Sequence, residues 1–168
     1  MRLKILFPLI LSFVLPGCSS PQQQTLSTSV ERFEREGSSI LKGVKVPAGA
    51  DMYFASGIVA NPKDASLPNG DPNRFGDTYE QSVSALKRIE AYLGEEGLSL
   101  KDVVAMKVYV APDPQNDHKP DFDGWFKAYA EFFNNESNPN KVARSTIGVY
   151  TLVNPDMLIE IEVRAVYP

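Results

Sequence analysis

The sequence predicts an α+β domain in which two helices cover one face of a mixed β-sheet. Residues 103–110 and 158–166 alternate as strands do, with aliphatic side chains along one face. Residues 78–93 and 123–133 instead carry apolar side chains at helical spacing. With short apolar segments before and between them, the order is β-β-α-β-α-β-β, which favours one layer of helices packed on one layer of sheet.

The first 17 residues are predicted to be a signal peptide. The start is basic at Arg2 and Lys4, and Ile5–Leu15 is an apolar run shorter than the about 20 residues that span a bilayer. The only cysteine, Cys18, follows directly. The sequence Leu15-Pro16-Gly17-Cys18 resembles the lipobox of bacterial lipoproteins. That resemblance implies cleavage before Cys18, lipidation of its thiol, and an exported protein anchored on the periplasmic side of a membrane.

Residues 18–32 are predicted to be a flexible tether, rich in Gln, Ser and Thr, and residues 33–168 a single domain. Residues 31–36 fit either a short strand or the end of the tether. Removing the signal leaves 15 of the 17 basic residues against all 21 acidic ones, a net charge of −6. This charge opposes a phosphate backbone, so no nucleic-acid partner is expected, and the membrane is expected to be reached only through the lipid.

The first half of the domain is predicted to hold a hairpin and a helix. Residues 44–46 and 52–57 are strand-like and are separated by a Pro-Ala-Gly turn. Residues 58–76 are rich in proline, glycine and asparagine, which is typical of either a disordered segment or the rim of a pocket. Asp77 or Thr78 caps the helix, whose apolar stripe indicates core packing.

The second half begins with a capped turn at residues 98–102 and the most apolar strand, residues 103–110, which is predicted to be central. The loop that follows contains the only histidine, His118. It has no second histidine or cysteine nearby, so a solvated side chain is favoured over a metal ligand. Asp123 is predicted to cap the second helix. This helix has a heavily aromatic face made of Trp125, Phe126, Tyr129, Phe132 and Phe133.

The last two strands carry the candidate site. Arg144 lies at the start of residues 142–149, and a strand-held guanidinium is a rigid fork for a carboxylate, although most strand arginines are simply solvated. In residues 158–166 the aliphatic side chains alternate with Glu160, Glu162 and Arg164. A hairpin between these strands would bring a carboxylate close to Arg144. The sheet face away from the helices also carries apolar residues, which predicts a subunit interface.

Four segments, in this order, resemble the RidA/YjgF family of enamine and imine deaminases. They are Ala55-Ser56-Gly57, Gly97 to Val104, Tyr129 to Phe133, and Ala143-Arg144-Ser145 with Ile159-Glu160-Ile161-Glu162. The resemblance implies a chorismate-mutase-like fold and homotrimers with clefts between subunits. It also implies hydrolysis of small imino or enamino acids to 2-oxo acids and ammonia, with no cofactor and no metal.

By the same resemblance, Arg144 clamps the substrate carboxylate and Glu160 positions or polarises the attacking water. Glu162 remains the competing assignment. Ser56 and Gly57, at the end of the early strand, are expected to contact substrate, as is Phe126.

Two departures from the family pattern bear on specificity. The Gly-Pro-Tyr segment usual before the early strand has no counterpart in residues 41–50, and Phe126 stands where many members carry asparagine. Both changes make the expected pocket less polar. Two functions therefore stay open, an exported imine or enamine hydrolase with altered specificity and a noncatalytic trimeric module that binds a carboxylate ligand or a protein. An endoribonuclease, an older label for the family, is disfavoured by the negative charge.

Overall fold

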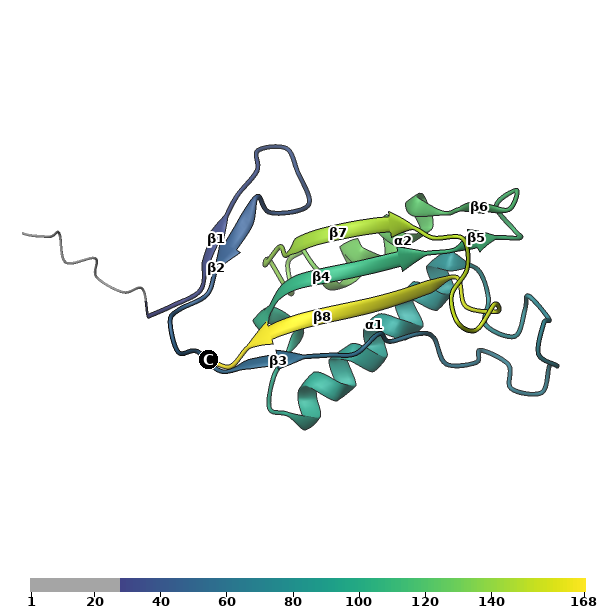
Figure 1. Ribbon diagram of the computed structural model, residues 1–168, viewed down its shortest axis with the longest axis horizontal. Helices are drawn as coiled ribbons and strands as arrows, with labels where there is room; N and C mark the ends of the chain where they lie inside the picture. The colour runs from purple at the N-terminus through teal and green to yellow at the C-terminus, as the bar shows by residue number, and fades with distance from the viewer. Residues whose placement is uncertain (1–27) are drawn as a thin grey trace, which may run out of the picture.

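The computed structural model describes residues 28–168, so the predicted signal peptide, Cys18 and most of the tether lie outside the described residues. A four-stranded sheet forms one layer, and both helices, α1 (Thr78–Glu95) and α2 (Phe122–Phe132), lie on one side of it (Figure 1). The sheet order is β3 (Met52–Phe54), β8 (Ile159–Val166), β4 (Val103–Val110) and β7 (Ala143–Gly148). This arrangement confirms the predicted α+β class and the central place of residues 103–110.

The predicted hairpin between the last two strands is wrong, because β4 lies between them. β7 runs parallel to β4, with Arg144 opposite Met106. β8 runs antiparallel to β4 on its other side, with Val163 opposite the same Met106. The most apolar strand thus takes a neighbour on both edges, and the chain crosses the end of β4 to pass from β7 to β8.

The N-terminal strands also pair differently from the prediction. β1 (Glu31–Phe33) pairs with β2 (Gly43–Lys45), whereas β3 pairs with β8 rather than with β2. The expected boundary after residue 32 therefore falls within a strand. The Arg32 guanidinium joins this small hairpin to the domain, donating to the carbonyl oxygen of Lys141 at 2.7 Å and to that of Val103 at 3.1 Å.

Each helix begins at an aspartate. Asp77 caps α1 as predicted, since its carboxylate accepts from the Glu80 amide at 2.8 Å and the Glu80 carboxylate accepts from the Asp77 amide. α2 is capped by Asp121, which accepts from the Gly124 amide at 2.9 Å, and not by Asp123, which lies within the first turn. The turn η1 (Leu100–Asp102) is capped by Ser99, in agreement with the sequence.

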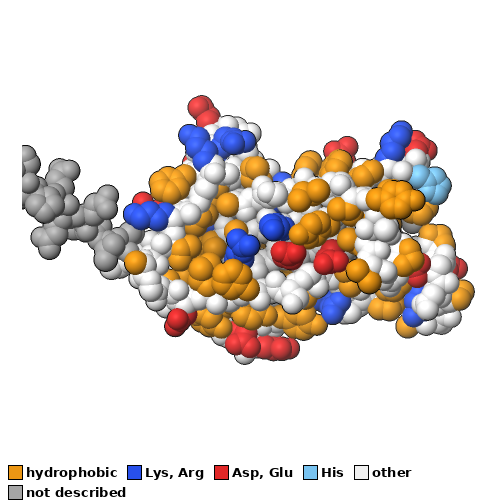
Figure 2. Space-filling model, in the orientation of Figure 1, with side chains coloured by type: hydrophobic (Ala, Val, Ile, Leu, Met, Phe, Trp, Pro, Cys, Tyr) orange, Lys and Arg blue, Asp and Glu red, His pale blue; other side chains and the backbone are white. Residues whose placement is uncertain are grey.

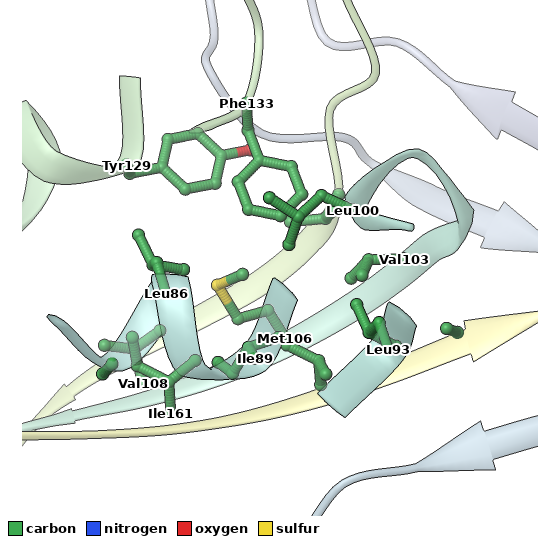
Figure 3. Packing of buried hydrophobic residues seen from close by; sticks show 14 of the residues in the cluster. Leu86, Ile89, Leu93, Leu100, Val103, Met106, Val108, Tyr129, Phe133 and Ile161 are labelled. Atoms are coloured by element: carbon green, nitrogen blue, oxygen red, sulfur yellow. The ribbon is translucent and has the colours of Figure 1, made fainter. Parts of the chain in front are cut away.

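The core fills the space between the sheet and the two helices (Figure 3). α1 contributes Leu86, Ile89 and Leu93, and the inward face of β8 contributes the four predicted aliphatic residues, all at most 1% exposed: Ile159, Ile161, Val163 and Ala165. Trp125 and Tyr129 of α2 are buried, as is Phe133, the residue that follows the helix. Phe126, on the same aromatic face in the sequence, is instead 44% exposed.

Residues 58–76 form a loop that packs on the rest of the domain. Ala60 and Phe75 bury themselves with Met157, and the Gly70 amide donates to the Asp156 carboxylate at 2.9 Å. His118 is exposed, between the short strands β5 (Pro112–Asp113) and β6 (Lys119–Pro120). Within residues 28–168, neither helix is long and apolar enough to cross a membrane.

Candidate functional site

Arg144 projects from β7 toward α2. It is opposite Met106, which is buried beneath the helices, and residues opposite each other in a sheet share a face. The guanidinium carbon lies 4.1 Å from the ring centre of Tyr129, 5.1 Å from that of Phe126 and 5.4 Å from that of Trp125. Arg144 is thus held among three aromatic rings at the edge of the sheet, a favourable setting for a planar cation.

Among residues 28–168, no anion matches the charge of Arg144. Burial lowers the pKa of Arg144, but a guanidinium stays protonated at neutral pH. Within residues 28–168 its Nη1 atom is buried without a hydrogen-bond partner, and it forms no ion pair. Thr146 Oγ1, two positions along the same face of β7, is also buried and unpartnered. A buried cation and a hydroxyl without partners are costly, and an anionic ligand would relieve that cost.

Glu160 lies on the opposite face of the sheet. It is opposite Tyr109 on β4, which is in turn opposite Ile147 on β7, and these side chains point away from the helices. The predicted meeting of Glu160 with Arg144 therefore does not occur within one chain. Glu160 instead lies over Gly57, where an added Cβ would be 2.6 Å from the Glu160 carboxyl carbon. Two predicted site residues, Glu160 and Gly57, are thus in contact, and exposed Ser56 adjoins them.

Glu162 shares the face of Glu160 but has a partner. Its carboxylate accepts a hydrogen bond from the Tyr109 hydroxyl at 3.0 Å, and this bond raises the pKa of Tyr109. Glu160 has no hydrogen bond or ion pair to its carboxylate within the part of the chain that the structure describes. Of the two glutamates, Glu160 is therefore the one whose carboxylate is available for another group.

The outer face of the sheet is hollowed beside the loop that joins β1 and β2. The hollow has a volume of about 420 Å³, and its lining includes Lys107, Arg144, Glu162 and Arg164 from the sheet and Arg35 and Lys42 from the loop. Figure 2 shows acidic and basic side chains close together near the middle of this face, among hydrophobic ones. Sequence analysis did not single out Lys107, although it is the only charged residue within β4.

Among residues 28–168, no three His, Cys, Asp or Glu side chains gather in a group that could hold an ion. What the arrangement offers is a cation among aromatic rings on one face and a carboxylate over glycine on the other.

Comparisons with known proteins define the family. The family model described as Endoribonuclease L-PSP matches residues 46–167, so the chain belongs to this family. A RutC family protein of Pyrococcus horikoshii is 32% identical over 117 residues, covering 70% of this chain and 79% of the relative. The RidA/YjgF resemblance of the sequence is thereby confirmed at the level of the family.

Solved structures share the fold. A conserved Rid family protein, YyfB, from Yersinia pestis has a TM-score of 0.61 at 22% identity, covering 82% of this chain and 98% of its own. TdcF from E. coli, solved with bound serine, has a TM-score of 0.54 at 27% identity, covering 73% of this chain and 85% of its own. Trimers are typical of the family.

Proposed function

We propose that this protein hydrolyses imino or enamino acids to 2-oxo acids and ammonia without a cofactor. The observation that carries the proposal is the unpaired Arg144 guanidinium, whose Nη1 has no partner within residues 28–168, on a strand of this family's domain. A guanidinium pairs with a carboxylate through two parallel hydrogen bonds, which fixes the plane of a 2-imino acid. Its imine carbon is then presented in a defined orientation.

Little further chemistry is required of the protein. An enamino acid first tautomerises to the imine. Water adds to the electrophilic imine carbon and one of its protons passes to the nitrogen, which gives a carbinolamine. The remaining hydroxyl proton then also passes to the nitrogen, and the carbon–nitrogen bond breaks to release ammonia as the 2-oxo acid forms. Glu160 takes the proton from water and returns it to nitrogen, because its carboxylate has no partner within the described chain. Ser56 and Gly57 lie beside Glu160, and Phe126 lies beside Arg144, so the residues around both groups contact the substrate.

Arg144 and Glu160 can act on one substrate only if two or more copies of the chain assemble. Arg144 and Glu160 lie on opposite faces of one sheet. The proposed enzyme is therefore a homotrimer whose clefts combine Arg144 of one subunit with Glu160 of a neighbour. The outer sheet face supports this proposal, since it leaves Phe54 62% and Ile147 41% exposed in a single chain.

A noncatalytic module that binds a carboxylate ligand or a protein is the second candidate. It is favoured by Phe126, 44% exposed beside Arg144 at the position where many RidA/YjgF proteins carry asparagine. Such a module would keep the clamp and lose the polar contacts that hold water. It predicts Arg144-dependent binding without turnover.

The proposal can be tested by measuring ammonia release from a panel of imino acids that are generated in situ. We expect Arg144→Ala to weaken substrate binding by about 1.5–3 kcal/mol, the strength of a charge-assisted pair. Arg144→Lys should also bind poorly, because an ammonium cannot reproduce the planar fork. Glu160→Gln should lower kcat with little change in KM, whereas Glu162→Gln is the matched control on the same face.

Wild type that binds 2-oxo acids but releases no ammonia from any imine would favour the noncatalytic module. Unchanged binding together with a lowered melting temperature in Arg144→Ala would instead make Arg144 a structural residue.

We further propose that the protein is an exported lipoprotein, anchored through Cys18 on the periplasmic side of a membrane. The support is the basic start, the short apolar run and the small residues before Cys18. Intact-mass spectrometry of the membrane fraction tests this, with Cys18→Ser as the variant that should lose both the lipid mass and the membrane association. Retention of Met1 in the mature wild-type protein would contradict it.

A further inference from the structure

Two phenylalanines of α2 stay partly exposed beside β7. Phe122 and Phe126 are one helical turn apart, so their side chains lie on the same side of the helix. They are 37% and 44% exposed, whereas Trp125 and Tyr129 of the same helix are at most 2% exposed. Together, Phe122 and Phe126 form an apolar strip, which the packing of one chain leaves uncovered.

The apolar strip is continuous with Arg144. The Phe126 ring centre is 5.1 Å from the guanidinium carbon. The far end of the Phe122 ring lies 3.4 Å from the place of a Cβ on Gly148, so Phe122 stands against β7 two residues beyond Thr146. Because successive residues of a strand point to opposite faces, Arg144, Thr146 and Gly148 share the face of β7 that is turned to α2.

The two ends of this row differ in chemistry. At one end are the unpartnered Arg144 Nη1 and Thr146 Oγ1. At the other end Gly148 contributes no side chain and Phe122 contributes an aromatic ring. A ligand that fits this row has an anionic head and an apolar tail.

We propose that the ligand held by Arg144 is a 2-imino or 2-oxo acid with a bulky aliphatic or aromatic side chain, which packs on the apolar strip. The inference rests on the proposed function, because it takes the Arg144 clamp as the carboxylate site. Small acids such as pyruvate have no side chain that reaches Phe122. Each methylene group buried on the rings should tighten binding about fourfold.

The alternative occupant of the apolar strip is a second copy of this chain. A neighbouring subunit that covered Phe122 and Phe126 would leave no room for a ligand side chain. Binding would then not depend on side-chain size, and substitution of either phenylalanine would change assembly instead.

Isothermal titration calorimetry of the full-length protein with pyruvate, 2-oxobutyrate, 4-methyl-2-oxopentanoate and phenylpyruvate tests the inference. We expect phenylpyruvate to bind at least about tenfold more tightly than pyruvate, since several carbon atoms are buried. Phe126→Asn and Phe122→Ala should each reduce this ratio to about threefold or less. Phe33→Ala is the matched control, because Phe33 is 47% exposed on β1 and should leave the ratio unchanged.

The outcomes separate the inference from the proposed function. Arg144-dependent binding of all four acids with equal affinity would overturn the inference and leave the clamp in place. If Phe126→Asn or Phe122→Ala dissociated the trimer and left the phenylpyruvate-to-pyruvate affinity ratio unchanged, the apolar strip would belong to the subunit interface. That result would also overturn the inference. Failure of Arg144→Ala to weaken any of the four acids would overturn the proposed function itself.

Discussion

At the scale of single residues, Gly57 decides where the Glu160 carboxylate can lie. The carboxylate occupies the space that a side chain at position 57 would take, and an added Cβ would overlap it. Glycine is required here for close approach, since the Gly57 backbone has no positive φ. The Glu160 carboxylate of β8, a candidate catalytic group, therefore lies directly against the backbone at Gly57, just after β3.

We predict that Gly57→Ala displaces Glu160 and slows imine hydrolysis. A displacement of about 1 Å in a positioned catalytic group costs on the order of 10²-fold in rate, and kcat should change more than KM because the Arg144 clamp is untouched. Steady-state kinetics on any substrate that the wild type turns over measures this.

Gly94→Ala is the control for Gly57→Ala. A Cβ on Gly94 would meet nothing within 4 Å, and the residue lies in α1. This substitution should raise the free energy of unfolding by about 0.5–1 kcal/mol and leave activity unchanged. Full turnover in Gly57→Ala would remove Glu160 from the catalytic role.

At the scale of elements, local periodicity predicted which residues face the core, but it did not predict which strands pair with each other. Ile159, Ile161 and Val163 alternate with charged residues, and the two-residue period of a strand assigns their faces without knowledge of any partner. The neighbours of β7 and β8 depend instead on contacts far along the chain. A hairpin is the simplest pairing for consecutive strands, but β4 offers a more apolar edge to both.

The site was predictable to the same extent. Arg144 and Glu160 stand out by residue type. Glu160 interrupts an aliphatic pattern, and Arg144 lies at the start of a strand-like run. Their placement on opposite faces required the register of β7 and β8 on β4, which no local pattern contains. Helical spacing placed Phe126 on the same aromatic face as Trp125, but only the folded structure shows that Phe126 stays 44% exposed beside Arg144.

The start of α2 gives a prediction that separates two neighbouring aspartates. Asp121 accepts from the Gly124 amide, so Asp121→Ala leaves a helix N-terminal donor without its acceptor and should cost about 1 kcal/mol of unfolding free energy. Asp123→Ala should cost only a few tenths of a kcal/mol, since Asp123 only adds negative charge to the first turn. Urea denaturation of both variants measures the difference. A larger loss in Asp123→Ala would restore the cap that the sequence suggested.

At the scale of the whole molecule, a single chain does not bring the two proposed catalytic groups together. Arg144 faces α2 at the β7 edge of the sheet, and Glu160 faces outward from β8, with β4 between their strands. A packed sheet cannot be crossed by these side chains, so the two groups meet only if different subunits supply them. Closed rings of identical subunits provide such a contact at every interface.

We therefore predict that two inactive variants restore activity when they assemble together. In mixed trimers that contain both Arg144→Ala and Glu160→Gln chains, one cleft of each trimer, about one third of the clefts, should combine an intact Arg144 with an intact Glu160. Ammonia release should recover to a similar fraction of the wild-type rate. Coexpression with two different affinity tags isolates the mixed trimers, and light scattering gives their mass. The control pairs Arg144→Ala with the double variant Arg144→Ala/Glu160→Gln, which has no intact arginine and should stay inactive. Inactive mixed trimers, or a wild-type protein that is a monomer at micromolar concentration, would place both groups outside a shared cleft.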